Sequence, residues 1–154
     1  MTRLQFHIKP IGPDELTSWR ALRKALWPQA SRAEHQQETE DMLKQPERYL
    51  AVIAVSPEAD AIGFAEASIR RDYVNGCDGS PVVFLEGIYV SPVSRRMGVA
   101  RALCMSVEQW GVLQGCEEFA SGTDINNADS QRLHEALGFA ESERVVFFKK
   151  ALPK

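Results

Sequence analysis

One carboxylate interrupts an apolar run near the middle of the chain. Residues 84–90 are aromatic, aliphatic or β-branched except for Glu86 and Gly87, which is the pattern of a buried strand. A carboxylate in such a run is unusual, and a positioned carboxylate can take a proton from a reacting group as a general base. We therefore interpret Glu86 as a candidate catalytic base. The alternative is a paired or exposed strand carboxylate without a chemical role.

The residues that follow this run have the composition of an anion-binding turn. Residues 95–100, with the sequence RRMGVA, lead from the strand into the next helix. Small residues let the backbone approach a ligand closely, and the first turn of a helix offers N–H groups without intrahelical partners. This combination predicts that a phosphate-bearing cofactor binds just beyond Glu86. The alternative is a solvated pair of arginines at a helix start.

The composition is that of one ordinary folded domain. The 154 residues are 44% hydrophobic and 25% charged, which predicts a single domain over residues 1–154. The formal net charge of −3 argues against a nucleic-acid partner, because binding nucleic acid requires a basic face. An acidic balance is compatible with a cationic substrate.

The sequence also argues against a membrane segment, a disulfide framework and a metal site. No apolar run is long enough to span a bilayer, and residues 1–16 lack the apolar core of a signal peptide. The three cysteines, Cys77, Cys104 and Cys116, are odd in number and lack metal-ligand spacing. We expect a cytoplasmic protein without a bound metal.

Hydrophobic periodicity predicts a mixed α/β fold that places both chemical features at one strand-to-helix junction. The expected strands cover residues 6–10, 49–55, 61–73, 82–90, 117–121 and 144–150. The expected helices follow Pro13 up to Leu26, and then cover residues 31–43, 98–114 and 130–137. Ser31 and Glu34 have capping-box spacing. The helix at 98–114 between two strands implies a right-handed parallel crossover.

Two motifs resemble those of the GNAT acyltransferase superfamily. Arg95-x-x-Gly98-x-Ala100 is similar to its Arg/Gln-x-x-Gly-x-Gly/Ala turn, and residues 133–139, LHEALGF, are similar to its LYxxLGF segment. The order of the predicted elements agrees over nearly the whole chain. The resemblance implies an α/β GNAT fold, with a mixed central sheet of about six to seven strands flanked by about four helices. It also implies acetyl-CoA as cosubstrate.

The resemblance assigns the cofactor contacts to these motifs and to the strand before them. The backbone of Ile88, Tyr89 and Val90 would bond the pantetheine and the acetyl carbonyl, next to a bulge at Gly87. The side chains of Ile88 and Val90 are expected in the core. Asn127 would contact pantetheine, or is only a turn or cap residue. The pyrophosphate would be wrapped by Arg95, Arg96, Met97, Gly98, Val99 and Ala100.

A narrower resemblance covers four further segments. LWP at residues 26–28, GFAEASIRRDYVNGC at 63–77, SPVVFLEGIYV at 80–90 and ESERVVFF at 141–148 are similar to bacterial aminoglycoside 6'-N-acetyltransferases. This implies direct transfer of an acetyl group to an aminoglycoside 6'-amine in a ternary complex, giving antibiotic resistance. The cationic substrate would meet Trp27, Tyr73, Glu86 and Glu143. Packing is the alternative for Trp27 and Tyr73, and a plain surface position is the alternative for Glu143.

Two positions depart from these families. Relatives carry Ser-Asp after the penultimate strand where this chain has Ser121-Gly122, and Asp124 is the candidate replacement for the missing carboxylate. The alternative is a weakened or reshaped substrate site. Where many relatives have a Tyr that protonates the departing thiolate, this chain has His134. An imidazolium can also protonate a thiolate, so His134 is a candidate catalytic acid. The alternative is a structural His.

Three further expectations follow from the resemblance and its gaps. The resemblance implies a homodimer, in which residues 144–150 and the loop after Tyr73 would meet a second subunit. The alternative for residues 144–150 is an apolar strand inside one domain. Gly122 favours a competing interpretation, an acetyltransferase for another small amine or a peptide N-terminus. The other competing interpretation is a non-catalytic acyl-CoA-binding module.

Overall fold

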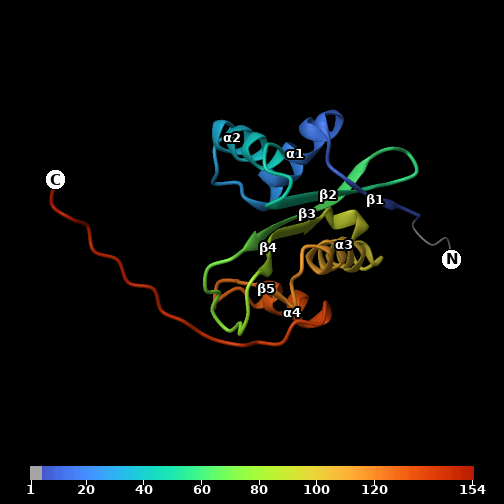
Figure 1. Cartoon of the computed structure of the whole chain (residues 1–154). Coiled ribbons are helices and arrows are strands. Elements are labelled where there is room, and N and C mark those ends of the chain that lie inside the picture. The colour runs from blue at the N-terminus through green and yellow to red at the C-terminus, as the bar shows by residue number, and fades with distance from the viewer. Residues whose placement is uncertain (1–4) are drawn as a thin grey trace. The chain divides into compact units, whose positions relative to one another are not determined.

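The computed structural model describes residues 5–154. The chain divides into two compact units, the first ending at Gly122 and the second comprising Thr123–Lys154. The first unit holds a five-stranded sheet with helices packed on it (Figure 1). None of the helices in residues 5–154 is long and apolar enough to cross a membrane.

The sheet is antiparallel except at one edge. Its strands, in spatial order, are β1 (His7–Pro10), β2 (Tyr49–Val55), β3 (Ala61–Arg70), β4 (Val82–Val90) and β5 (Glu118–Ser121). The first four strands pair antiparallel, and β5 joins β4 in parallel. Parallel neighbours need a crossover connection, which α3 (Val99–Leu113) provides as predicted.

The other helices of this unit lie on the opposite face of the sheet from α3 (Figure 1). They are α1 (Leu16–Leu26), preceded by a 3-10 turn at Pro13–Glu15, and α2 (Arg32–Leu43); a second 3-10 turn, Pro92–Ser94, precedes α3. Ser31 caps α2: its Oγ accepts a hydrogen bond from Glu34 N over 3.1 Å, and the Glu34 side chain accepts one from Ser31 N over 3.4 Å. The predicted capping box is confirmed.

Strand β3 separates two packed layers because its side chains alternate between the faces. Phe64 packs with Trp19 of α1 on one face. Gly63 faces α3, where a Cβ built on it would lie 3.3 Å from Val99 Cγ1 and 3.4 Å from Leu103 Cδ1. Trp19, Phe64 and Leu103 are fully buried, and each such side chain contributes about 1.5–3 kcal/mol of hydrophobic stabilisation. The sheet is therefore fixed from both sides.

A β-bulge interrupts the pairing of β3 with β4 at Glu86. Glu66 lies opposite Gly87, whereas Ala67 lies opposite Leu85, so β4 has one more residue than β3 at this point. The extra residue is left unpaired and shifts the alternation of the side chains beyond it. The bulge expected next to Gly87 is confirmed. It places Glu86 and Gly87 on the same face, toward α1 and α2.

Strand β5 pairs with β4 over only four residues. Val82 to Leu85 lie opposite Glu118 to Ser121, and β4 then continues to Val90. Beyond Leu85, the β5-side edge of β4 has no strand partner among residues 5–154. The backbone groups of a strand need partners, so this edge is suited to bond an extended ligand.

The second unit contains one helix followed by a long irregular segment. Helix α4 (Ala128–Ala136) begins after Asn127, whose Oδ1 accepts a hydrogen bond from Ser130 N over 3.0 Å. Residues 140–154 run extended without helix or strand (Figure 1). The strand predicted at residues 144–150 is therefore wrong, because a strand requires a neighbour to pair its backbone groups and this unit supplies none.

The strand count of the predicted fold needs the matching correction. The part of the chain that the structure describes has five strands and four α-helices, whereas six to seven strands were expected. The mixed α/β architecture and the number of helices are as expected.

Candidate active site

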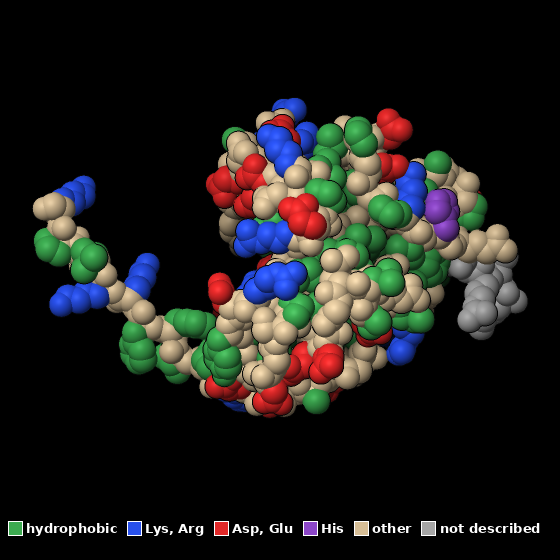
Figure 2. All heavy atoms as spheres, viewed as in Figure 1, with side chains coloured by type: hydrophobic (Ala, Val, Ile, Leu, Met, Phe, Trp, Pro, Cys, Tyr) green, Lys and Arg blue, Asp and Glu red, His purple; other side chains and the backbone are tan. Residues whose placement is uncertain are grey.

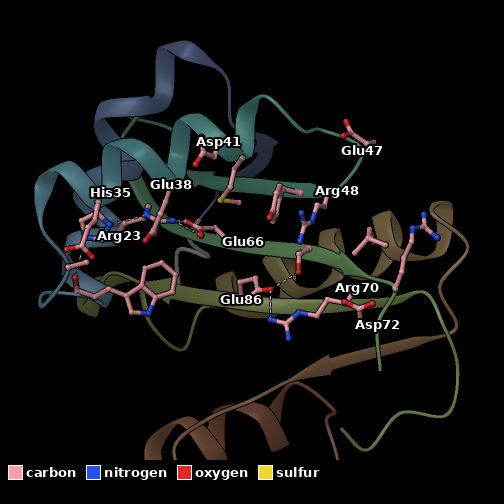
Figure 3. A pocket seen from close by; sticks show the side chains of 18 of the residues that line it. Arg23, His35, Glu38, Asp41, Glu47, Arg48, Glu66, Arg70, Asp72 and Glu86 are labelled. Atoms are coloured by element: carbon pink, nitrogen blue, oxygen red, sulfur yellow. Dashed lines mark hydrogen bonds and ion pairs between the residues drawn. The ribbon is translucent and has the colours of Figure 1, made fainter. Parts of the chain in front are cut away.

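A cavity of about 1380 Å³ lies in the first unit between α2 and strands β3 and β4 (Figure 3). Its lining includes three of the residues predicted to bind substrate: Trp27, Tyr73 and Glu86. Trp27 directly follows α1, Tyr73 follows β3 and is 76% exposed, and Glu86 lies at the bulge of β4. The fold thus brings together residues that are far apart in the sequence, and their role toward substrate remains a prediction.

Glu86 is held at the cavity by two donors from β3. Its Oε1 accepts hydrogen bonds from Ser68 Oγ over 2.6 Å and from Arg70 Nη2 over 2.8 Å. The Arg70 guanidinium also lies over the Phe84 ring, with Cζ 3.6 Å from the ring centroid. Both bonds to Glu86 end on Oε1, and 33% of its side chain is exposed, so the carboxylate is accessible from the cavity.

Trp27 forms the cavity wall beside this carboxylate. A Cβ built on Gly87 would lie 2.5 Å from Cη2 and from Cζ2 of Trp27, so the ring rests directly on the backbone of the bulge. The ring also meets Phe64 edge-on, with centroids 6.1 Å apart and an interplanar angle of 71°. The half-buried Trp27 side chain therefore both packs against the core and lines the cavity.

Charged side chains dominate the rest of the cavity lining. Asp and Glu side chains gather over α2 in Figure 2. The carboxylates that line the cavity are Glu34, Glu38, Asp41, Glu47, Glu66, Asp72 and Glu86, against four arginines, Arg23, Arg48, Arg70 and Arg71. An excess of carboxylates in a concave site attracts cations.

The turn before α3 contains two residues in the left-handed conformation. Gly98 is the N-cap of α3 with φ of 86°, and Arg96 has φ of 64°. Nothing lies within 4 Å of a Cβ built on Gly98, so the backbone conformation rather than lack of space selects glycine there. Met97 is exposed, whereas Val99 is buried and has only its backbone to offer a ligand.

Arg95 turns back onto β4. Its Nε donates a hydrogen bond to the Val90 carbonyl over 2.8 Å, and its Cζ lies 5.6 Å from the centroid of the Tyr89 ring. Val90 is buried, as expected for a core side chain, whereas Ile88 is only half-buried. Arg95 thus ties the turn to the strand, and Ala100 continues it as a half-buried residue of α3.

The remaining predicted residues lie in the second unit. His134 is in the last turn of α4, where Nδ1 lies 2.7 Å from the Ser130 carbonyl and the ring meets Phe139 edge-on at 5.3 Å between centroids. Asp124 Oδ1 accepts a hydrogen bond from Asn126 N over 2.8 Å. Asn127 has the N-cap role that was its alternative interpretation. Glu143 is exposed in the extended segment.

Several residues of the cavity were missed in the sequence. Ser68 and Arg70 alternate with core residues along β3, so their side chains share one face, but nothing in the sequence pairs them with Glu86. Glu66 gives the same signal as Glu86, a carboxylate in an apolar strand, and it is 3% exposed beside Arg23. Burial raises the pKa of the Glu66 carboxyl, and the Arg23 guanidinium acts in the opposite direction.

The thiols of the chain are free and give no metal cluster. Cys77, Cys104 and Cys116 are unbridged. Within residues 5–154, no three His, Cys, Asp or Glu side chains are grouped to hold a metal ion. Burial, together with Glu108, raises the pKa of the Cys104 thiol to about 11, so this thiol is protonated at neutral pH and is a poor nucleophile.

Comparison with known proteins identifies the family. The Acetyltransferase (GNAT) family matches residues 16–139. The chain belongs to this family. Membership confirms the resemblance that rested on residues 95–100 and 133–139, and it accounts for the parallel strands β4 and β5 joined by α3.

The relatives of this GNAT chain include proteins named aminoglycoside N(6')-acetyltransferase type 1. One from Serratia marcescens is 52% identical over 139 residues, which cover 90% of this chain and 94% of that protein. Another from Salmonella enteritidis is 49% identical over 143 residues, which cover 93% of this chain and 97% of that protein. These relatives confirm the narrower resemblance drawn from the four dispersed segments.

Solved structures give the same result for the fold. AAC(6')-Iy in complex with the bisubstrate analog CoA-S-monomethyl-acetylneamine is 48% identical with a TM-score of 0.91, and the match covers 96% of this chain and 99% of that chain. AAC(6')-Ih from Acinetobacter baumannii is 44% identical with a TM-score of 0.92, over 97% of this chain and 100% of that chain. The GNAT architecture of the chain is thereby established.

Proposed function

We propose that this GNAT chain transfers an acetyl group from acetyl-CoA directly to the 6'-amine of aminoglycosides and so gives resistance to these antibiotics. The observation that carries the proposal is the position of Glu86 at the bulge of β4, inside an acidic cavity and next to the unpaired edge of the same strand. Relatives of 49–52% identity that carry the corresponding name support it.

The proposed role of Glu86 is that of general base. An aminoglycoside amine is mostly protonated near neutral pH, and only the neutral amine can attack a thioester carbonyl. Glu86 takes the proton from the ammonium group, directly or through a water. The neutral nitrogen then bonds to the acetyl carbon, the carbon–sulfur bond breaks, and the thiolate leaves. The nitrogen loses its remaining surplus proton to water, and the thiolate is protonated as it departs. Trp27 and Tyr73 are proposed to hold the sugar rings and their cations by aromatic faces.

The proposed cosubstrate site lies along the β4 edge and the turn into α3. Acetyl-CoA supplies the activated acetyl group as a thioester. The backbone of Ile88, Tyr89 and Val90 lies on the edge that β5 leaves unpaired, which fits hydrogen bonds to pantetheine and to the acetyl carbonyl. The left-handed turn and open surroundings of Gly98 fit a pyrophosphate at the helix start. A solved relative that holds a CoA bisubstrate analog supports this assignment.

The proposed pyrophosphate contacts follow the exposure of each residue in the turn. Arg96 and Met97 are exposed and contribute N–H groups, with a charge-assisted contact from the Arg96 side chain. Val99 and Ala100 contribute backbone N–H groups of the first turn of α3. Arg95 contributes its backbone, because its Nε is bonded to the Val90 carbonyl.

The second unit completes the proposal. His134 is proposed to protonate the departing thiolate. A carbonyl oxygen only accepts, so the Nδ1 that faces the Ser130 carbonyl carries a proton, and His134 can donate only from Nε2 of its imidazolium form. Asn127 is proposed to contact pantetheine, and Asp124 and Glu143 to bind substrate amines. We keep residues 1–154 as one functional domain, since the family match at 16–139 extends across both units.

Release of free thiol from acetyl-CoA tests the function. The expected result is turnover with kanamycin or tobramycin and none with aminoglycosides that lack a free 6'-amine. No turnover above background with either kanamycin or tobramycin would defeat the proposal. If CoA binds without turnover and Glu86→Gln alters no rate, the non-catalytic acyl-CoA module is the correct interpretation instead.

Gly122 favours a second candidate function. The narrower resemblance implies a carboxylate at this position, and glycine has no side chain to provide it. We therefore expect weaker binding of an aminoglycoside amine. The alternative is acetylation of another small amine or a peptide N-terminus. A panel of such amines separates the two functions, because a kcat/KM higher than that for every aminoglycoside would favour the alternative.

The state of assembly and the compartment are further proposals. Val146, Phe147 and Phe148 are 77%, 84% and 92% exposed, and hydrophobic side chains stand out along the extended segment in Figure 2. A second copy of the chain that covered them would form the homodimer implied by the resemblance. Sedimentation of the full chain and of a chain ending at Glu143 tests this, because loss of the segment should give monomers. The three free thiols fit a cytoplasmic location.

A further inference from the structure

A buried ion cluster forms part of the cavity wall and joins α1, α2 and β3 (Figure 3). Arg23 of α1, His35 of α2 and Glu66 of β3 are only 2%, 3% and 3% exposed. The proposed mechanism uses none of them. Burying charges is costly unless they are paired and hydrogen-bonded, so a cluster of this kind has to be explained.

Arg23 uses all three nitrogens of its guanidinium within this cluster. Nη1 donates to both oxygens of Glu66 over 2.6 Å each, and Nη2 bonds Glu38 of α2. Nε donates to His35 Nδ1 over 3.2 Å. Trp19 Nε1 completes the site by donating to Glu66 Oε2 over 2.8 Å. The plane of the guanidinium is thereby fixed in space by groups from two other elements, α2 and β3.

His35 extends the cluster to the residue after α1. Because Arg23 Nε is a donor, His35 Nδ1 must accept, and the ring proton is therefore on Nε2. Nε2 lies 3.3 Å from the Trp27 carbonyl and donates to it. A chain of two hydrogen bonds thus runs from the Arg23 guanidinium through His35 to the backbone of Trp27.

The face of the same guanidinium supports the side chain of Trp27. Arg23 Cζ lies 4.9 Å from the centroid of the Trp27 ring, within the range of a cation–π contact. Cη2 and Cζ2 of the same ring system rest on Gly87, next to Glu86. Glu66, which anchors Arg23, lies opposite Gly87 in the strand register. The cluster therefore fixes both the ring and the strand position on which the ring rests.

We infer that Arg23 is a positioning residue that holds Trp27 over the β4 bulge and thereby sets how the substrate lies against Glu86. This inference rests on the proposed function. A planar donor fork and a flat cationic face are both used, and a lysine ammonium offers neither. Arg23→Lys keeps the charge and the stem of the side chain but releases the Trp27 ring and the His35 bond.

A double-variant cycle tests whether Arg23 acts through Trp27. Arg23→Lys should raise the KM for kanamycin about tenfold, while the KM for acetyl-CoA changes less than about twofold. In a Trp27→Ala background, the same substitution should cause no further rise in the KM for kanamycin. Additive effects of the two substitutions, or an equal rise in both KM values, would overturn the inference.

The matched control is Arg20→Lys. Arg20 lies one turn earlier on α1 and also bonds α2, through Nε to Thr39 Oγ1 over 3.0 Å, but Trp27 is not among its bonded partners. Its KM for kanamycin should match that of the unsubstituted protein. A rise equal to that of Arg23→Lys would show that any loosening of α1 against α2 has the same effect, and it would overturn the inference.

A second readout needs no substrate and stays valid if the proposed function fails. The chain has three tryptophans, so 5-fluorotryptophan labelling gives three ¹⁹F signals, and Trp27→Phe identifies that of Trp27. Arg23→Lys should shift the Trp27 signal and leave that of Trp110 unchanged. An unmoved Trp27 signal would overturn the inference, whereas a shifted signal without aminoglycoside turnover would defeat the proposed function alone.

If Arg23→Lys does not fold, Glu38→Gln replaces it. Glu38 bonds the same guanidinium and its side chain is 54% exposed, so the substitution spares the core. It should shift the Trp27 signal in the same direction by a smaller amount and raise the KM for kanamycin about twofold. An unmoved Trp27 signal, or a rise in KM that persists in the Trp27→Ala background, would overturn the inference.

Discussion

Arg70 and Glu86 form an ion pair across the β3–β4 bulge, with Nη2 of the arginine 2.8 Å from Oε1 of the glutamate. The two side chains are 42% and 33% exposed, so the pair is open to the cavity. An exposed ion pair is weak, and a cationic amine can compete with the guanidinium for the carboxylate. The Arg70 guanidinium therefore already gives Glu86 the kind of positive charge that a cationic substrate would bring.

Glu86→Gln should lower kcat for kanamycin by about 10²- to 10⁴-fold, because an amide keeps the shape of the side chain but cannot accept the proton. The KM for acetyl-CoA should stay unchanged. Steady-state release of free thiol measures both quantities. Glu58→Gln, in the exposed turn after β2, is the control and should keep full activity. A Glu86→Gln protein with unchanged kcat would rule out the role of base.

Gly87→Ala should disturb both the fold and the cavity. The added Cβ would lie 2.5 Å from two ring carbons of Trp27, so the ring has to move. Overpacking of this kind costs about 1–3 kcal/mol, which thermal unfolding should show as a lower Tm, and the KM for kanamycin should rise. Gly12→Ala is the matched control, because its Cβ would meet only the end of the Glu15 side chain at 3.4 Å.

Gly122→Asp should lower the KM for aminoglycosides if the first proposed function is correct. A Cβ at this position meets only Phe84 Cζ at 3.9 Å, so the fold has room for a side chain. The new carboxylate would supply the charge that the resemblance implies at this position. Isothermal titration with tobramycin measures the affinity, and Gly122→Asn separates charge from size. Equal affinities of the two variants would argue for a substrate other than an aminoglycoside.

His134→Phe should lower kcat, and His134→Tyr should restore it, because a phenol can protonate the thiolate in place of the imidazolium. Phenols keep their proton up to about pH 10, so the Tyr variant should retain its kcat at alkaline pH, where imidazoles are neutral. The pH dependence of kcat for the three proteins is the measurement. A structural role for His134 predicts instead that the Phe variant keeps kcat and the Tyr variant gains nothing.

Cys104→Ala should keep kcat, because the proposed mechanism transfers the acetyl group directly and does not use this thiol. The pKa of this thiol is raised to about 11, so its alkylation should accelerate with pH up to about that value. Because the pKa is raised in the folded protein, the Cys104 thiol of the unfolded chain ionises at a lower pH than that of the folded chain. The stability that Cys104 contributes is therefore complete below about pH 9 and is lost as the pH rises to 11. An acetylated protein that passes its acetyl group to substrate would contradict direct transfer.

The elements that the sequence predicted well are those with a strong local signal. Ser31 and Glu34 mark the start of α2 through their own spacing, and the apolar run at β4 marks a strand whatever its neighbours are. The turn at Gly98 was found for the same reason. In each case the residues that determine the structure lie within a few positions of one another.

The sequence was misleading where a structure depends on distant partners. Residues 144–150 have strand composition but lack a pairing strand, so they stay extended. The Arg23–Glu66 pair joins residues 43 positions apart, and no local pattern connects them. Ser68 and Arg70 reach Glu86 only because the bulge turns the carboxylate toward them.

The bulge also limits how the protein can escape an inhibitor. The side chains of β4 alternate between the faces of the sheet in one register up to Leu85 and in the opposite register from Gly87 onward. The length of the strand is therefore as constrained as the identity of its residues. Loss or gain of one residue in Val82–Val90 would move the side chains of half of the strand to the opposite face of the sheet. A compound anchored on the backbone of this strand would therefore face few viable sequence changes, whereas one that relies on the α2 carboxylates would face many.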